Sequence, residues 1–240
     1  MNLEEVTIRS SSDAYSRTAW IAPGPTTAHA LCLILDGEHY LHGMDALPVL
    51  DALAASGTLS PTTFLFLSHG GAEARHVDYV GSARFARFVS EDVVAWTRAH
   101  VPTISAGRDH LICGVSLSGL AAAHLAVTYP QVFSAALCQS GSFWWEPESF
   151  AALVRARAPA SSRFWLSVGD QETDVNVSHP PTGMFQTLSQ IEGVERARSV
   201  LVEAGADVRL HRFHGGHTFA PWRGELADAL RWLSRRDSPT

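Results

Sequence analysis

Residues 110–120 place a serine where a nucleophilic alcohol is expected. They have the sequence HLICGVSLSGL, so Ser116 follows an apolar run typical of a buried strand and precedes an alanine-rich run typical of a helix. A sharp turn from strand to helix exposes a serine hydroxyl, and it needs small neighbours because the flanking backbones nearly touch. Gly114, Ser118 and Gly119 meet this need, although the usual G-x-S-x-G pattern has glycine where Ser118 stands. The pattern favours nucleophilic catalysis at Ser116.

The same serine also fits a purely structural role. Serine is common as the N-cap of a helix that follows a strand. In the catalytic interpretation, the turn also places the Leu117 N–H in the first turn of that helix, where it can stabilise an oxyanion. The partners of Ser116 elsewhere in the chain decide between the two interpretations.

An alcohol nucleophile needs a base with a pKa near neutrality, and histidine is the side chain suited to that task. The chain has 12 histidines, of which His217 is the best candidate. It follows the last predicted strand, and Gly215 and Gly216 permit a tight loop before it. His211 and His214 precede it at spacings of three, but a strand and its loop would not bring three imidazoles together. No metal site is expected.

A carboxylate is needed to orient the imidazole and to stabilise its protonated form. The segment GDQETD, which follows the predicted strand FWLSV, offers Asp170, Glu172 and Asp174. The pattern alone does not choose among these three side chains.

These side chains follow predicted strands of an alternating α/β pattern. Short apolar runs alternate with longer runs of helical periodicity, which indicates a doubly wound, mostly parallel sheet with helices on both faces. Strands are predicted at residues 6–9, 18–21, 30–35, 63–67, 110–115, 133–139, 164–168 and 208–213. Helices are predicted at residues 45–55, 85–99, 120–128 and 222–233, with one more that ends near Ala204. We expect residues 1–240 to form one domain with its site at the carboxyl ends of the strands.

Composition excludes several classes of function. A net charge of −6 argues against a surface built for nucleic acid, which needs clustered lysine and arginine. The longest apolar runs are far shorter than the roughly 20 residues of a membrane-spanning helix, so no membrane partner is expected. The N-terminus lacks the basic and apolar regions of a signal peptide, which favours a cytoplasmic location. Three cysteines, Cys32, Cys113 and Cys138, fall in apolar runs and are predicted to be reduced core thiols.

Six stretches in order along the chain resemble the Putative esterase family of α/β-hydrolases, in particular its branch of enterochelin and other siderophore ester hydrolases. They are LDGEHY (35–40), RHVDY (75–79), ICGVSLSGLAAAHLAVTYPQVF (112–133), QSGSFWW (139–145), VGDQE (168–172) and GGHTFAPWR (215–223). The resemblance implies Ser116 as nucleophile and His217 as base. It implies Glu172 as acid, because in related esterases the acid lies three residues after the glycine that ends the strand.

The resemblance also implies that the DGEHY loop supplies a second oxyanion donor, near Gly37 or Glu38. Two features depart from the family: Ser118 replaces the usual glycine, and the chain begins almost directly with the hydrolase strands. The segment 173–184 also differs, and residues 173–190 are the candidate for a lid over the pocket.

Four side chains are candidates for the substrate pocket. His39 lies in the predicted oxyanion loop. Arg75 can bind an anionic substrate or pair with Glu91 or Asp78 in a structural role. Trp144 and Trp145 follow a strand, where they can stack on an acyl or aryl group or pack under a loop.

The predicted function is therefore hydrolysis of a small-molecule carboxylic ester through an acyl-enzyme, with no metal or organic cofactor. The same site is compatible with an acyltransferase, a thioesterase or a peptide hydrolase. A different class, a non-catalytic hydrolase fold that binds a ligand or partner, is also compatible with the fold. The joint presence of Ser116, His217 and an acidic loop favours the enzyme.

Overall fold

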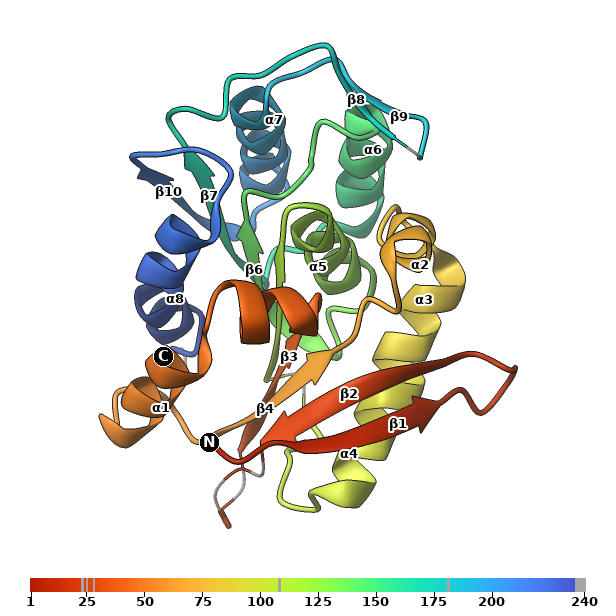
Figure 1. The fold of residues 1–240 in the computed structure, drawn as a ribbon, viewed down its shortest axis with the longest axis vertical. Helices are drawn as coiled ribbons and strands as arrows, with labels where there is room; N and C mark the ends of the chain where they lie inside the picture. The colour runs from red at the N-terminus through yellow and green to blue at the C-terminus, as the bar shows by residue number, and fades with distance from the viewer. Residues whose placement is uncertain (23, 25, 28, 108, 181, 236–240) are drawn as a thin grey trace.

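An eight-stranded sheet runs through the protein (Figure 1). The structure is a computed structural model that describes residues 1–235 apart from positions 23, 25, 28, 108 and 181. The strands, in spatial order, are β1 (Glu4–Arg9), β2 (Ser16–Ala22), β4 (Thr62–Leu67), β3 (Ala30–Ile34), β5 (His110–Val115), β6 (Phe133–Gln139), β7 (Arg163–Gly169) and β10 (Asp207–Phe213). The pairs β1–β2 and β2–β4 are antiparallel and all pairs from β4 to β10 are parallel. The predicted doubly wound, mostly parallel sheet is confirmed.

The central strands are apolar along their whole length because helices cover both faces of the sheet. Every residue of β5 is buried, and so are four of the five residues of β3. One face packs against α3 (Ala83–Arg87), the π-helical turn η2 (Phe88–Val93), α4 (Val94–His100), α5 (Leu117–Thr128), α6 (Pro147–Arg157) and α7 (Gln190–Glu203). The other face packs against α1 (Leu47–Ala55) and α8 (Phe219–Leu233). Because the strands from β4 to β10 run parallel, their carboxyl ends lie at one edge of the sheet (Figure 1).

All eight predicted strands are present, with ends displaced by no more than two residues. The predicted helix at 85–99 is built from α3, η2 and α4 in succession. The cysteines are buried and carry free thiols, as predicted. Among the described residues, no helix combines the length and the apolarity that crossing a bilayer requires.

Four elements differ from the prediction. The helix α2 (Ala72–Asp78), which follows β4, was not predicted. A π-helical turn, η1 (His39–Gly43), follows β3, and α6 was not predicted. Only Phe150 and Val154 of α6 are buried. So few core-facing residues give the sequence a weak apolar periodicity, which is why the helix was not predicted. The insertion at residues 173–190, the candidate lid, contains a hairpin from β8 (Val177–His179) and β9 (Met184–Gln186).

Candidate active site

Ser116 occupies a strained turn between β5 and α5. Its backbone has φ 56° and ψ −120°, a conformation that non-glycine residues seldom adopt, and such strain is often found at functional sites. The turn is tight, since a Cβ atom on Gly114 would lie 2.1 Å from the Ser118 carbonyl oxygen. The Ser116 N–H donates to the Gln139 carbonyl of the neighbouring strand at 2.8 Å. The predicted strand–turn–helix geometry is present.

Ser118, the departure from the usual glycine, has a definite role in the turn. Its Oγ accepts a hydrogen bond from the Val115 N–H at 2.8 Å and donates one to the Val115 carbonyl at 2.8 Å. Both residues are almost fully buried. The hydroxyl therefore ties the end of β5 to the start of α5.

Replacing Ser118 with alanine is expected to lower the free energy of unfolding by about 1–3 kcal/mol, because it leaves a buried N–H and a buried carbonyl at Val115 without this partner. Urea unfolding followed by circular dichroism measures the change. Ser199→Ala is the matched control, since the Ser199 hydroxyl bonds a helix carbonyl at an exposed position. Equal unfolding midpoints for the two variants would show that the Ser118 hydroxyl does not brace the turn.

His217 contacts a buried carboxylate. Its Nδ1 lies 2.7 Å from Glu172 Oε2, and the other carboxylate oxygen accepts from Ser140 Oγ at 2.6 Å and from the Gly169 N–H at 2.8 Å. The imidazole and the Trp222 ring form a T-shaped pair, with ring centroids 4.8 Å apart and an interplanar angle of 89°. Carboxylate and indole together fix the orientation of the ring and leave Nε2 as the nitrogen for another partner.

The loops that carry Glu172 and His217 meet closely. A Cβ atom on Gly169 would lie 2.2 Å from the Gly215 carbonyl oxygen, so only glycine permits this approach. The Gln171 N–H donates to the same Gly215 carbonyl at 3.0 Å. The end of β7 and the end of β10 thus hold the carboxylate beside the imidazole.

The other two candidate acids have different contacts. Asp170 pairs with His214 at 2.9 Å, and the Gly215 N–H and His214 lower the pKa of its exposed carboxyl. Asp174 lines the cavity beside Ser116, and its backbone carbonyl accepts from Gln186 Nε2 at 3.0 Å. Within the described residues, Glu172 is the carboxylate that contacts His217.

The three histidines near the end of the chain do not converge. His211 is partly exposed and lies 3.8 Å from buried Glu225, whereas His214 is exposed and pairs with Asp170. Over the part of the chain that the structure describes, no group of three or more potential ligands is arranged to hold a metal ion.

Backbone donors lie at the two places proposed from the sequence. Leu117 is the first residue of α5, and N–H groups in the first turn of a helix have no partner within it. In the other loop, the Asp36 carbonyl accepts from the N–H groups of His39 and Tyr40, while those of Gly37 and Glu38 donate to no acceptor among the described residues. The Glu38 carboxylate itself accepts from the Ser68 hydroxyl and from the His69 N–H.

Arg75 pairs with Asp36, and the predicted pairing with Glu91 or Asp78 is wrong. Its Nε and Nη2 donate to the Asp36 carboxylate at 2.7–3.0 Å, whereas Asp78 binds Arg17 and the Tyr15 hydroxyl. Asp36 is fully buried, and burial opposes its ionisation. The adjacent His39 imidazole and the Arg75 guanidinium outweigh burial and lower the pKa of Asp36 to about 2.

Asp36→Asn is expected to destabilise the protein by about 3 kcal/mol at pH 7, because it leaves a largely buried guanidinium without its charge partner. Since the pKa of Asp36 is lower in the folded state than its ordinary value of 3.8, the stabilisation is complete above pH 4 and is lost toward pH 2. Urea unfolding at pH 7, 5, 4 and 2.5 should therefore show a difference between the two proteins that shrinks with acid.

Asp45→Asn is the matched control, because Asp45 forms an exposed ion pair with Arg223 at 3.2 Å. It should change stability by less than about 0.5 kcal/mol at every pH. A similar loss in both variants, or a difference that stays constant with pH, would contradict the role given to the buried pair.

Two cavities adjoin Ser116 and His217. One, of about 210 Å³, is also lined by Ser142, Trp144 and the β8–β9 hairpin residue His179. The other, of about 400 Å³, is lined by residues that include His39, Arg75, Phe219 and Trp222. The nucleophile and the base therefore have space for a substrate on two sides.

The two candidate tryptophans have different environments. Trp144 is buried beside Ser116 and stacks on His179, with centroids 4.9 Å apart and an interplanar angle of 12°. Trp145 lines neither cavity beside Ser116; it lines a separate cavity along α5 and α6 with His124. Of the two tryptophans predicted for the substrate pocket, Trp144 lines a cavity that adjoins Ser116 and Trp145 lines a different one.

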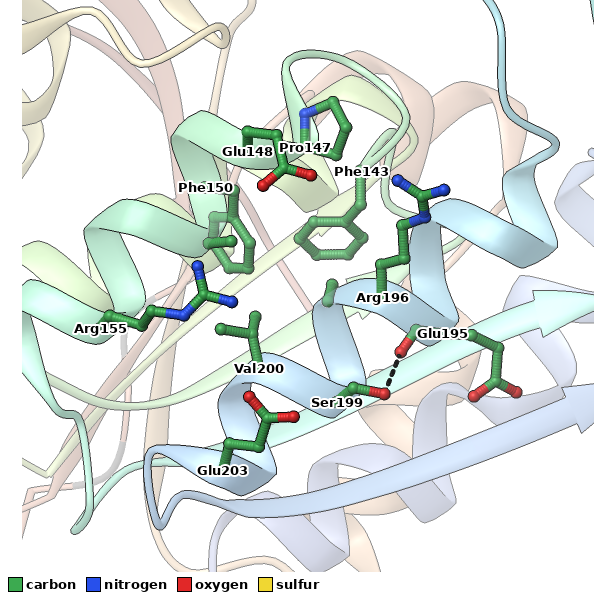
Figure 2. A pocket seen from close by; sticks show the side chains of 12 residues that line it. Phe143, Pro147, Glu148, Phe150, Arg155, Glu195, Arg196, Ser199, Val200 and Glu203 are labelled. Carbon is green, nitrogen blue, oxygen red and sulfur yellow. Dashed lines mark hydrogen bonds between the residues drawn. The ribbon is translucent and has the colours of Figure 1, made fainter.

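A further cavity of about 400 Å³ lies between α6 and α7 and contains neither Ser116 nor His217. Figure 2 shows the rings of Phe143 and Phe150 between the guanidinium groups of Arg155 and Arg196. This cavity is therefore separate from the candidate active site.

The sequence did not indicate four of the side chains that build the site. They are Ser140, Ser142, His179 and Gln190. The first two belong to the stretch QSGSFWW, in which the aromatic residues gave the stronger signal. The last two belong to the insertion and to the start of α7, and only the fold brings them to the site.

A family model described as "Putative esterase" matches residues 22–233. The chain belongs to this family. The Iron(III) enterobactin esterase of Dickeya dadantii (strain 3937) is 30% identical over 217 residues, which are 87% of this chain and 48% of that protein. The Iron(III) salmochelin esterase of Escherichia coli O6:H1 is 25% identical over 216 residues, 85% of this chain and 50% of that protein. This member of the Putative esterase family thus spans about half the length of these two curated relatives.

Solved structures show that the fold of this family member is the α/β-hydrolase fold. The enterobactin esterase of Shigella flexneri, crystallised in the presence of enterobactin, has a TM-score of 0.82 at 24% identity, and the match covers 97% of this chain and 59% of that chain. A ferulic acid esterase has a TM-score of 0.76 at 14% identity over 97% of this chain and 98% of that chain. The family and fold predicted from the sequence are confirmed.

Proposed function

We propose that this protein is a serine hydrolase of small-molecule carboxylic esters, with Ser116 as nucleophile, His217 as base and Glu172 as acid. The observation that carries the proposal is the bond of 2.7 Å between His217 Nδ1 and Glu172 Oε2. It lies beside a serine held at φ 56° at the end of a central strand. A binding protein has no need for a strained serine and an oriented imidazole in one cavity.

In the acylation half of the reaction, His217 Nε2 takes the proton of Ser116 Oγ, and Oγ bonds to the ester carbonyl carbon. The Leu117 N–H, with a second donor from Gly37 or Glu38, stabilises the negative oxygen of the tetrahedral intermediate. The bond to the leaving alcohol then breaks, and His217 returns its proton to that alcohol. Glu172 stabilises the imidazolium during both transfers.

In the second half, His217 takes a proton from water and the hydroxyl oxygen attacks the acyl carbon. The bond to Ser116 Oγ breaks, and Oγ receives the proton from His217. The products are the free acid and the resting enzyme, so the cycle uses water alone as co-reactant.

The substrate class follows from the two cavities and from the relatives. The acyl group and the alcohol can occupy the cavities of about 210 and 400 Å³ on the two sides of Ser116. The names of the relatives, Iron(III) enterobactin esterase and Iron(III) salmochelin esterase, support siderophore esters as the class to test. Arg75 is the one arginine that lines these cavities among the described residues, and Asp36 already neutralises it. This charge balance favours an uncharged ester over an anionic iron complex.

The test is hydrolysis of a panel that runs from p-nitrophenyl acetate through methyl ferulate to a catecholate trilactone with and without iron. We expect turnover of the simple esters and a preference for the iron-free over the iron-loaded trilactone. A fluorophosphonate should label the protein once, and peptide mass spectrometry should locate the label on Ser116. A folded protein that hydrolyses no ester and takes up no label would overturn the proposal.

A further inference from the structure

The segment from Ser140 to Ser142, which we call the serine strap, contacts both the proposed acid and the proposed nucleophile. Ser140 Oγ donates to Glu172 Oε1 at 2.6 Å and accepts from Trp222 Nε1 at 2.9 Å. Two residues on, Ser142 Oγ lies 3.4 Å from Ser116 Oγ. The strap thus places one hydroxyl beside Glu172 and another beside Ser116 Oγ.

Contacts from several elements fix the strap in place. Gln190, at the start of α7, donates its amide to the carbonyls of Ser140 and Gly141. The Ser140 N–H donates to Ser167 of β7, and the Ser142 N–H donates to the Ser116 carbonyl at 3.0 Å. The position of Ser142 beside the nucleophile is therefore set by the fold rather than by a mobile side chain.

The Ser142 hydroxyl has one hydrogen-bond partner in the described part of the chain, and that partner is Ser116 Oγ. Ser142 is 2% exposed, and it lines the cavity of about 210 Å³ beside Ser116. A buried hydroxyl donates its proton where an acceptor is available. Either hydroxyl can donate in this contact, and a Ser116 proton that faces His217 for the reaction leaves Ser142 as the donor to Ser116 Oγ.

We propose that Ser142 is a positioning residue that donates to Ser116 Oγ and accelerates the release of the acyl group. The inference rests on the proposed function, since it concerns the acyl-enzyme on Ser116. Ser142 keeps its own proton throughout. In the step concerned, water adds to the acyl carbon, the bond from that carbon to Oγ breaks, and Oγ takes the proton that His217 received from the water.

The hydrogen bond should affect the two halves of the reaction unequally. In the free enzyme it already binds a hydroxyl oxygen, which is a good acceptor, so it stabilises the starting state of acylation. In the acyl-enzyme the same oxygen is an ester oxygen and a poor acceptor, and it gains negative charge only as the acyl bond breaks. A hydrogen bond to an oxygen that gains charge becomes stronger, so it lowers the barrier to deacylation.

Stopped-flow release of p-nitrophenol from p-nitrophenyl acetate separates the two rate constants. In Ser142→Ala we expect the deacylation rate constant to fall about 10-fold, the equivalent of one hydrogen bond, and the acylation rate constant to change less than about 2-fold. Intact-mass spectrometry during turnover should show a larger fraction of acetylated protein in this variant than in the wild type. A variant that was merely less well folded would not accumulate the acetyl-enzyme.

Ser140→Ala is the matched control in the same strap, because its hydroxyl contacts Glu172 and not Ser116. It should slow both halves of the reaction, since both depend on the orientation of His217. If Ser142→Ala proves poorly folded, Ser142→Cys keeps the volume with a weaker donor and should shift the ratio of rate constants in the same direction.

Equal slowing of both halves in the Ser142 variants, or an unchanged ratio, would overturn the inference while the wild type still turns over. If the wild type forms no acetyl-enzyme at all, the proposed function itself fails.

Discussion

Replacing Ser116 with alanine is expected to lower kcat for p-nitrophenyl acetate by about 10⁵-fold, because the variant lacks the oxygen that forms the acyl bond. Some catalysis over water should remain, since the donors at Leu117 and near Gly37 can still stabilise an oxyanion. The measurement is steady-state hydrolysis with enough variant protein to detect this low remaining activity. Fluorophosphonate labelling should be lost in parallel.

The fold of the Ser116→Ala variant should be intact, which makes the loss of activity interpretable. Alanine and serine pay a similar cost for the backbone at φ 56°, and the Ser116 hydroxyl makes a single long hydrogen bond, 3.4 Å to Ser142. We therefore expect a change in thermal unfolding midpoint of less than about 3 °C, which corresponds to about 1 kcal/mol for a chain of this length. A variant that keeps more than about 1% of wild-type kcat would exclude Ser116 as the nucleophile, since such a loss is far smaller than removal of a nucleophile causes.

The parts of the site that the sequence predicts are those set by local chain geometry. The turn at Ser116 is recognisable because strand, small residues and helix are consecutive in the sequence. The loop before His217 is recognisable for the same reason, since two glycines follow the last strand. Both segments build their geometry from residues only a few positions apart, and the structure has the predicted elements at both places.

The choice of acid could not come from local pattern. Asp170, Glu172 and Asp174 lie within five residues of one another, and each follows the same strand. The selection is made by His217, 45 residues later, which meets Glu172 because Gly169 lets the two loops approach. The resemblance to the esterase family favoured Glu172, whereas the residues alone left all three open.

The pairing of Arg75 shows the same limit. The sequence offered Glu91 and Asp78 as nearby carboxylates, but the partner is Asp36, 39 residues away on the loop after β3. Parallel packing of β3 against β4 brings the two loops together, and no local pattern encodes that meeting. Ser142 escaped prediction for a related reason, since its neighbour Ser116 lies on another strand end, 26 residues away.

Glu172→Gln is expected to lower kcat by about 10³- to 10⁴-fold, which is the effect of losing the carboxylate that orients a catalytic histidine. In the wild type, the Glu172 carboxylate accepts from three donors, the Ser140 hydroxyl, the Gly169 N–H and His217 Nδ1. Glutamine has one acceptor oxygen and an amino group that only donates, so it cannot serve all three.

If the amino group of the new glutamine faces His217, it forces Nδ1 to accept and moves the imidazole proton to Nε2, where the ring can no longer take a proton from Ser116. If the amino group faces the other way, it meets the Ser140 hydroxyl and the Gly169 N–H. These two groups are donors as well, so all three lack an acceptor there. Asp170→Asn is the matched control, because Asp170 contacts exposed His214 rather than His217, and it should change kcat less than about 2-fold. Loss of activity in the Asp170 or an Asp174→Asn variant, with Glu172→Gln near wild type, would assign the acid elsewhere in this loop.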